Sequence, residues 1–141
     1  MFELVLLSAW LICVVGVSAL LHECGHACAA RAVGWEVVGL RWHWYGLGLA
    51  AEANGRSDEL WKVALGGPCA TAVLALGFLA GTELPEPAPL IFWIGFVLNA
   101  TFLVTQLAPL PRFDGGQALA GLRRAPSSRD WSMEAERGRE G

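Results

Sequence analysis

Three long uncharged runs constrain the fold of this 141-residue chain more than any other feature. They occupy residues 4–21, 63–81 and 88–110. A helix that crosses a bilayer needs about 20 apolar residues, so each run is long enough to span. Hydrophobic residues make up 55% of the chain and charged residues only 16%, too apolar a composition for a small soluble domain. We therefore expect an all-α polytopic membrane protein with three transmembrane helices, at about residues 3–33, 60–82 and 88–110.

The distribution of basic residues predicts the direction of the helices. No Lys or Arg precedes the first run, four lie between the first and second, none lies between the second and third, and six follow the third. Cytoplasmic segments carry the excess of Lys and Arg, so the N-terminus is expected outside and the C-terminus in the cytoplasm. We expect a bacterial plasma membrane as the location. The net charge of −3 gives no indication of nucleic-acid binding.

Residues 34–60, between the first two runs, are too polar to span. Apolar and polar side chains alternate from Leu40 to Tyr45, and tryptophans in this segment suit a membrane–water interface. The alternation favours a short β-hairpin at the interface, with an irregular loop as the alternative. Gly46 and Gly48 are expected to interrupt the pattern. Residues 125–141 are polar and are expected to form a disordered cytoplasmic tail, which leaves residues 1–124 as the core.

A metal-binding pattern lies at the end of the first run, where His22-Glu23-Cys24-Gly25-His26 matches H-E-x-x-H. On a helix, imidazoles four residues apart share a face and reach one metal ion, and Glu23 can touch a metal-bound water. Ionisable groups within a membrane span are costly, so packing is a poor explanation for three of them in five residues. The four cysteines form no C-x-x-C pair, and buried, reduced side chains are expected.

Asp114 is the best candidate for a third ligand, which a catalytic zinc site requires. His22 lies roughly 27 Å along the first helix, towards its cytoplasmic end. The third span returns to that side and ends shortly before Asp114. His43 is the alternative ligand, in the interfacial segment. A plain turn is the alternative role for Asp114, because Asp-Gly is a common turn pair.

The chain resembles the site-2 protease family of intramembrane zinc metalloproteases in three segments. These are residues 22–34, 66–70 and 99–116, within a resemblance that covers residues 20–116. The resemblance implies that one zinc ion is held by His22, His26 and Asp114. It also implies that Glu23 is the general base, and that the hairpin offers an edge strand to an unwound substrate helix.

Two positions depart from the family pattern. Gln106 stands where the family has an Asn expected near the scissile carbonyl, and Thr71 stands where the second segment usually has Asn. Gln106 keeps an amide donor for the carbonyl, one methylene further out. Asn99 matches an Asn often found in the third segment. Gly66 and Gly67 are interpreted as packing residues that let the second span approach the metal-bearing helix.

These observations predict a zinc-dependent intramembrane endopeptidase. Its partner would be a membrane protein, cut in or near a transmembrane segment, in the lipid bilayer. One alternative is a catalytically weakened zinc-binding relative that acts as a regulator or scaffold. The other is a metal transporter, because intramembrane His and Asp also mark ion pathways.

Overall fold

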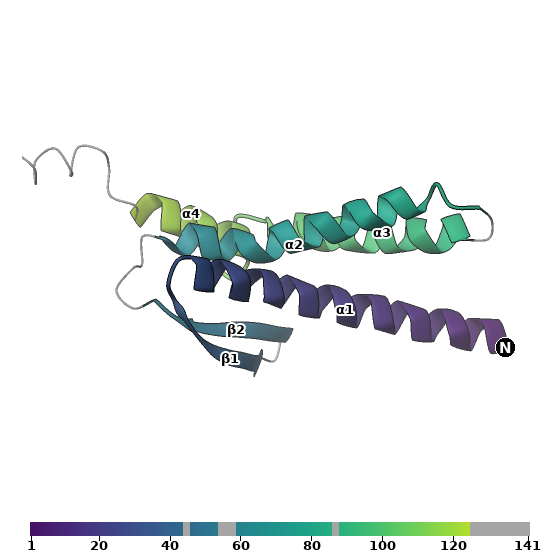
Figure 1. The fold of residues 1–141 in the computed structure, drawn as a ribbon, viewed down its shortest axis with the longest axis horizontal. Helices are drawn as coiled ribbons and strands as arrows, with labels where there is room; N and C mark the ends of the chain where they lie inside the picture. Colours follow the sequence, from purple (N-terminus) through teal and green to yellow (C-terminus); the bar gives the residue numbers. More distant parts are fainter. Residues whose placement is uncertain (44–45, 54–58, 86–87, 125–141) are drawn as a thin grey trace, which may run out of the picture.

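The computed structural model describes residues 1–43, 46–53, 59–85 and 88–124. Within these residues the elements are, in order, α1 (Phe2–Ala32), β1 (Glu36–His43), β2 (Gly46–Glu52), α2 (Leu60–Gly81), α3 (Ala88–Gln106) and α4 (Asp114–Arg124). The three long helices lie along one axis, with the hairpin beside the end of α1 (Figure 1). The predicted tail lies outside the described residues, so the domain boundary at residue 124 stays a prediction.

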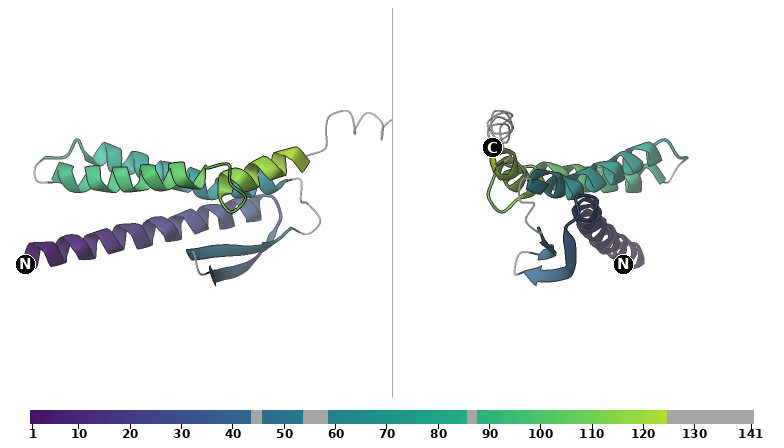
Figure 2. Two further views of the ribbon diagram at one scale, coloured as in Figure 1. Left: turned by 180° about the vertical axis from the view of Figure 1, so that it is seen from behind. Right: turned by 60° about the vertical axis from the view of Figure 1, so that its left-hand side comes forward.

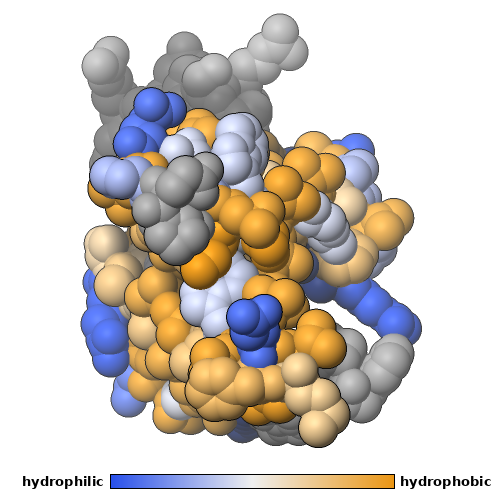
Figure 3. Space-filling model, turned by 90° about the vertical axis from the view of Figure 1, so that its right-hand side faces the viewer, coloured by the Kyte–Doolittle hydropathy of each residue, from blue (hydrophilic) through white to orange (hydrophobic). Residues whose placement is uncertain are grey.

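The three predicted spans are confirmed as helices long and apolar enough to cross a membrane. Many large apolar side chains point outward from them, including Ile12, Val73 and Val104, each more than 70% exposed. Seen along the long axis, much of the visible surface is hydrophobic (Figure 3). Such a surface is unfavourable in water and suits lipid, as expected for membrane spans.

The third helix ends at Gln106, four residues earlier than the apolar run predicts. Pro109 and Pro111 explain the early end, because proline lacks an N–H and disfavours helical geometry in the residue before it. The chain then turns, with Phe113 N donating to Leu110 O at 3.0 Å. A fourth helix, α4, starts at Asp114 and was not predicted.

Helices α1 and α2 cross at glycines. A Cβ atom on Gly66 would lie only 2.5 Å from the carbonyl oxygen of Gly25, and one on Gly67 would lie 2.6 Å from Nε2 of His22. Real Cβ atoms do not come this close, so any larger residue would push the helices apart. The packing interpretation of Gly66 and Gly67 is confirmed.

The predicted hairpin is also confirmed, as an antiparallel pair of β1 and β2. Strand β2 begins at Gly46 and continues through Gly48. The hairpin packs on the end of α1 and the start of α2 through an apolar cluster that includes Val33, Val63 and Leu49. This packing places β2 next to the metal-binding pattern.

The helices are not equally close. Helix α2 packs along both α1 and α3, whereas α1 and α3 scarcely touch, and α1 diverges from the other two towards its N-terminus (Figure 2).

The expectation of buried cysteines was wrong: all four are unpaired and exposed. They lie on helix surfaces that lipid would cover.

Candidate metal centre

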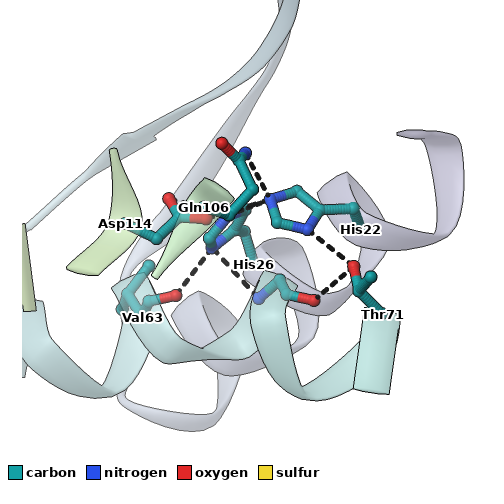
Figure 4. A network of polar contacts seen from close by, with 7 residues as sticks. His22, His26, Val63, Thr71, Gln106 and Asp114 are labelled. Carbon is teal, nitrogen blue, oxygen red and sulfur yellow. Dashed lines mark hydrogen bonds and ion pairs between the residues drawn. The ribbon is translucent and has the colours of Figure 1, made fainter. Parts of the chain in front are cut away.

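The two histidines of α1 meet Asp114 of α4 in the interior of the molecule. All three are buried, and their ligand atoms lie within 4.8 Å of one another. Nε2 of His22 is 3.0 Å from Asp114 Oδ2, and Nε2 of His26 is 3.3 Å from Asp114 Oδ1. The two Nε2 atoms are 3.1 Å apart. The three residues predicted as ligands from the sequence are thus brought together (Figure 4).

The tautomer of His22 is set by α2. Nδ1 of His22 lies 2.9 Å from the hydroxyl oxygen of Thr71, and that hydroxyl donates a hydrogen bond of 3.2 Å to the carbonyl of Gly67. Because the Thr71 proton is directed at Gly67, the Thr71 oxygen accepts the proton on Nδ1 of His22. Nε2 of His22 therefore keeps a free lone pair.

His26 is held in the same way. Its Nδ1 lies 2.8 Å from the carbonyl oxygen of Val63, which can only accept, so Nδ1 carries the proton. The N–H of Gly67 approaches the same nitrogen at 3.3 Å and would favour the other tautomer. The contact with Val63 is the shorter and stronger of the two, so it determines the tautomer of His26. Nε2 of His26 also keeps a free lone pair.

The three ligand groups therefore face one another with atoms that can only accept hydrogen bonds. Two imidazole lone pairs and a carboxylate face one another, and the buried Oδ2 of Asp114 has no hydrogen-bond donor. Acceptors crowded in this way repel one another unless a cation lies between them. Two histidines and a carboxylate form one of the ligand sets of catalytic zinc. The residues present fit a zinc ion.

Asp114 lies outside the three spans, and its charge state suits a ligand. Burial raises the pKa of Asp114, but in the metal-free site hydrogen bonds from His22 and His26, and their positive charge when protonated, lower it by a larger amount, so the net pKa lies below its ordinary value. The carboxyl group is consequently ionised at neutral pH, which is the form that binds a metal.

Two glycines let Asp114 reach the histidines. A Cβ atom on Gly115 would collide with the carbonyl of Leu107, and one on Gly116 with the carbonyl of Leu110. The start of α4 therefore packs directly beneath the backbone of the preceding turn. Asp114, in the first turn of α4, also compensates the positive end of the helix dipole.

Glu23 lies beside the trio without belonging to it. Its side chain is mostly buried at 9% exposure, and its carboxylate accepts a hydrogen bond from the backbone N–H of Leu49 in β2. Glu23 and the trio line one cavity of 720 Å³. Its walls come from α1, Trp35 just before β1, strand β2, α2, α3, the turn before α4 and α4 itself.

Gln106, the last residue of α3, points its amide at the same centre. Its Nε2 lies 3.3 Å from Nε2 of His22, and the side chain lines the cavity. An amide N–H directed at a lone pair agrees with the tautomer derived for His22. The longer side chain of Gln thus still reaches the site.

Sequence reasoning missed part of this arrangement. Thr71 was noted only as a departure from the family pattern, yet it orients His22. The signal was available, because Thr71 lies four residues after Gly67, one turn along the same face. The role of the Val63 carbonyl had no sequence signal, since every residue has one. His43, the alternative ligand, is in β1, and its side chain lies outside what the structure describes.

Comparisons with known proteins identify the family of the chain. Residues 2–112 match the family described as Peptidase M50B-like. A protein of Synechocystis named "Putative zinc metalloprotease sll0528" is 35% identical over 112 residues, which cover 74% of this chain and 29% of that protein. The chain thus matches less than a third of the length of this curated relative.

Proposed function

Because the chain belongs to the Peptidase M50B-like family, whose matched region holds both histidines and the three apolar helices, we propose that it is a zinc-dependent intramembrane endopeptidase. It would hydrolyse a peptide bond in or near a transmembrane segment of another membrane protein. The observation that carries the proposal is the buried cluster of two histidine lone pairs and the Asp114 carboxylate, with Glu23 beside it.

His22, His26 and Asp114 would hold one zinc ion, and Thr71 and Val63 would fix the two rings. Bound zinc supplies Lewis acidity, which acidifies water and polarises a carbonyl group. Metal-binding histidines are commonly oriented by a hydrogen bond from the second ring nitrogen, as both are here. The two rings therefore need no rearrangement to present Nε2 to the ion.

Glu23 would serve as the general base. Its carboxylate would take a proton from the attacking water and pass it to the leaving amine. The hydrogen bond from Leu49 N–H holds one side of the carboxylate in place. The adjacent position of Glu23 and His22 on α1 keeps the base next to the ion without making it a ligand.

Gln106 and β2 would position the substrate. The Gln106 amide points at the centre and can donate to the scissile carbonyl. In β2, the Leu49 N–H points at Glu23 and so away from β1. An unwound substrate segment could pair with this free edge by strand addition, with its backbone drawn across the metal centre.

The direction of insertion is also part of the proposal. The charge distribution supports an outside N-terminus and a cytoplasmic C-terminus. The metal centre lies near the C-terminal end of α1, so cleavage would occur close to the cytoplasmic face. The bacterial origin of the relative supports a bacterial plasma membrane.

The test uses the full chain, purified in detergent, with a fluorogenic transmembrane peptide as substrate. Glu23→Gln should keep the zinc content and lose at least about 100-fold in cleavage rate, the lower end of the range for a general base. Glu3→Gln, at the far end of the same helix, is the matched control. Equal cleavage by wild type and Glu23→Gln would refute the catalytic proposal. A zinc-loaded wild type that cleaves nothing would favour the weakened relative instead. Zinc flux in vesicles would favour a transporter.

A further inference from the structure

The cavity of the metal centre has an unusual charged residue in its wall. Arg112 lies in the turn between α3 and α4, two residues before Asp114, and lines the same cavity. Its side chain is exposed, and no ion pair joins it to any other residue that the structure describes. Arg112 is also the single Lys or Arg among the lining residues of that cavity.

The other two charged residues of the cavity each have a polar neighbour. Asp114 faces the two histidines, and Glu23 accepts the Leu49 N–H. If a zinc ion is bound, its two positive charges cancel the negative charges of Glu23 and Asp114. The charge of Arg112 is then left over, so the cavity attracts an anion and repels a cation.

The position of Arg112 decides which part of a substrate it meets. Helix α3 has ended at Gln106, and the turn that carries Arg112 stands at the end of the spans rather than within them. A substrate residue at this level is near the membrane surface, where the free-energy cost of placing a carboxylate is small. Pro111, immediately before Arg112, restricts the turn and so limits where the guanidinium can reach.

We propose that Arg112 selects substrates that carry an acidic residue just outside their transmembrane helix, within a few residues of the cleaved bond. This inference rests on the proposed function and deepens it by naming a substrate class. A guanidinium pairs well with a carboxylate because its planar donors match two oxygens.

The same charge would reject most other membrane proteins. Cytoplasmic flanks of transmembrane helices are usually rich in Lys and Arg, which Arg112 repels. Selection therefore has an attractive part and a repulsive part, as in other specific interfaces. A single Arg at this position therefore favours acidic flanks over basic ones.

The experiment compares three transmembrane peptides that differ only in one flanking residue, Glu, Gln or Lys, placed beside the cleaved bond. Cleavage is measured in neutral detergent. Binding is measured separately with the Glu23→Gln variant, by fluorescence anisotropy of labelled peptides. Wild-type chain should prefer the Glu peptide over the Lys peptide by about 3- to 10-fold, as expected for a partly exposed charge pair. The preference should shrink at high salt.

Arg112→Gln should remove the preference, and Arg112→Glu should invert it in favour of the Lys peptide. Arg123→Glu, which makes the same charge change on exposed α4 outside the cavity lining, should leave the preference intact. Unchanged zinc content shows that the variants keep the site. An unaltered Glu preference in Arg112→Glu would overturn the proposal. So would an effect of Arg112→Glu that is equal for all peptides and appears only in vesicles of anionic lipid, because Arg112 would then contact a lipid phosphate.

The outcomes separate the two proposals. Suppose that wild-type chain cleaves no peptide, but the Glu23→Gln variant still binds the Glu peptide preferentially through Arg112. The proposed selectivity is then supported and the proposed catalytic function is refuted. If cleavage occurs without any charge preference, the function stands and the selectivity falls.

Discussion

The two faces of α1 bury polar side chains in opposite ways. Towards α2, where glycines bring the backbones together, Nδ1 of His22 and Nδ1 of His26 each have a hydrogen-bond partner. Towards α3, Ser18 Oγ and Asn99 Oδ1 are buried and have no hydrogen-bond partner among the residues that the structure describes. Both residues line a second, mostly apolar cavity of 360 Å³ between the two helices.

The contrast between the two faces of α1 indicates which side of the helix is rigid. A buried polar group that lacks a partner costs free energy, and a closed, paired interface avoids that cost. At the α1–α2 interface both Nδ1 atoms are paired, and the close backbones leave no space for a larger side chain at Gly66 or Gly67. The α1–α3 interface around Ser18 and Asn99 is open and incompletely paired, so substitutions of residues around that second cavity should matter much less to the metal centre.

The largest effect is expected from Gly67→Ala on the closed face. The new Cβ atom would overlap Nε2 of both histidines, so zinc content should fall from about one ion per chain to near zero. Metal analysis of the purified chain measures this. Gly77→Ala in the same helix is the control, because a Cβ there meets nothing within 4 Å. A fully zinc-loaded Gly67→Ala variant would contradict the tight crossing.

The second-largest effect is expected from Asp114→Ala. The change removes one of three proposed ligands but leaves both rings in place, so zinc affinity should fall by more than about 100-fold, beyond the range for residues that only orient a ligand. Competition with a fluorescent chelator measures the affinity. Glu59→Ala removes a partly exposed carboxylate that pairs only with Lys62 among the described contacts, and should leave zinc affinity unchanged.

Thr71→Val should weaken zinc binding by about 10- to 100-fold, because the Nδ1 proton of His22 loses its acceptor. Thr71→Ser keeps the hydroxyl and should restore most of the affinity. The same change on the open side, Thr105→Val, removes a hydroxyl that bonds only within its own helix. If Thr105→Val weakened zinc binding as much as Thr71→Val, the contrast between the two faces would fail.

Ser18→Ala should have the smallest effect. The hydroxyl has no partner to lose, so the free energy of unfolding should change by less than about 1 kcal/mol, with zinc affinity unchanged. Thermal unfolding in detergent measures the first quantity and chelator competition the second. A large loss of either would mean that the open face supports the centre.

The sequence predicted the parts of this molecule that follow from local patterns. Apolar length located the spans, alternation located the hairpin, and four-residue spacing brought His22 to His26. Asp114 was chosen because the third span returns to the same side, and the structure does place it against both histidines.

What the sequence could not predict depends on contacts between distant segments. The end of α3 at Gln106 was hidden because residues 107–110 are as apolar as the helix before them. Helix α4 was missed because Asp-Gly-Gly is typical of a turn. Its glycines serve instead to fit beneath the carbonyls of Leu107 and Leu110, which no local pattern reveals.

The place of Asp114 on α4 has a consequence for folding. The two histidines lie on the first helix of the chain and the carboxylate lies on the last helix that the structure describes. An ion held by all three would join these ends as a cross-link does, and would oppose their separation. Its free energy of binding would add to that of folding, so a chelator should lower the thermal stability of the whole bundle as well as its activity.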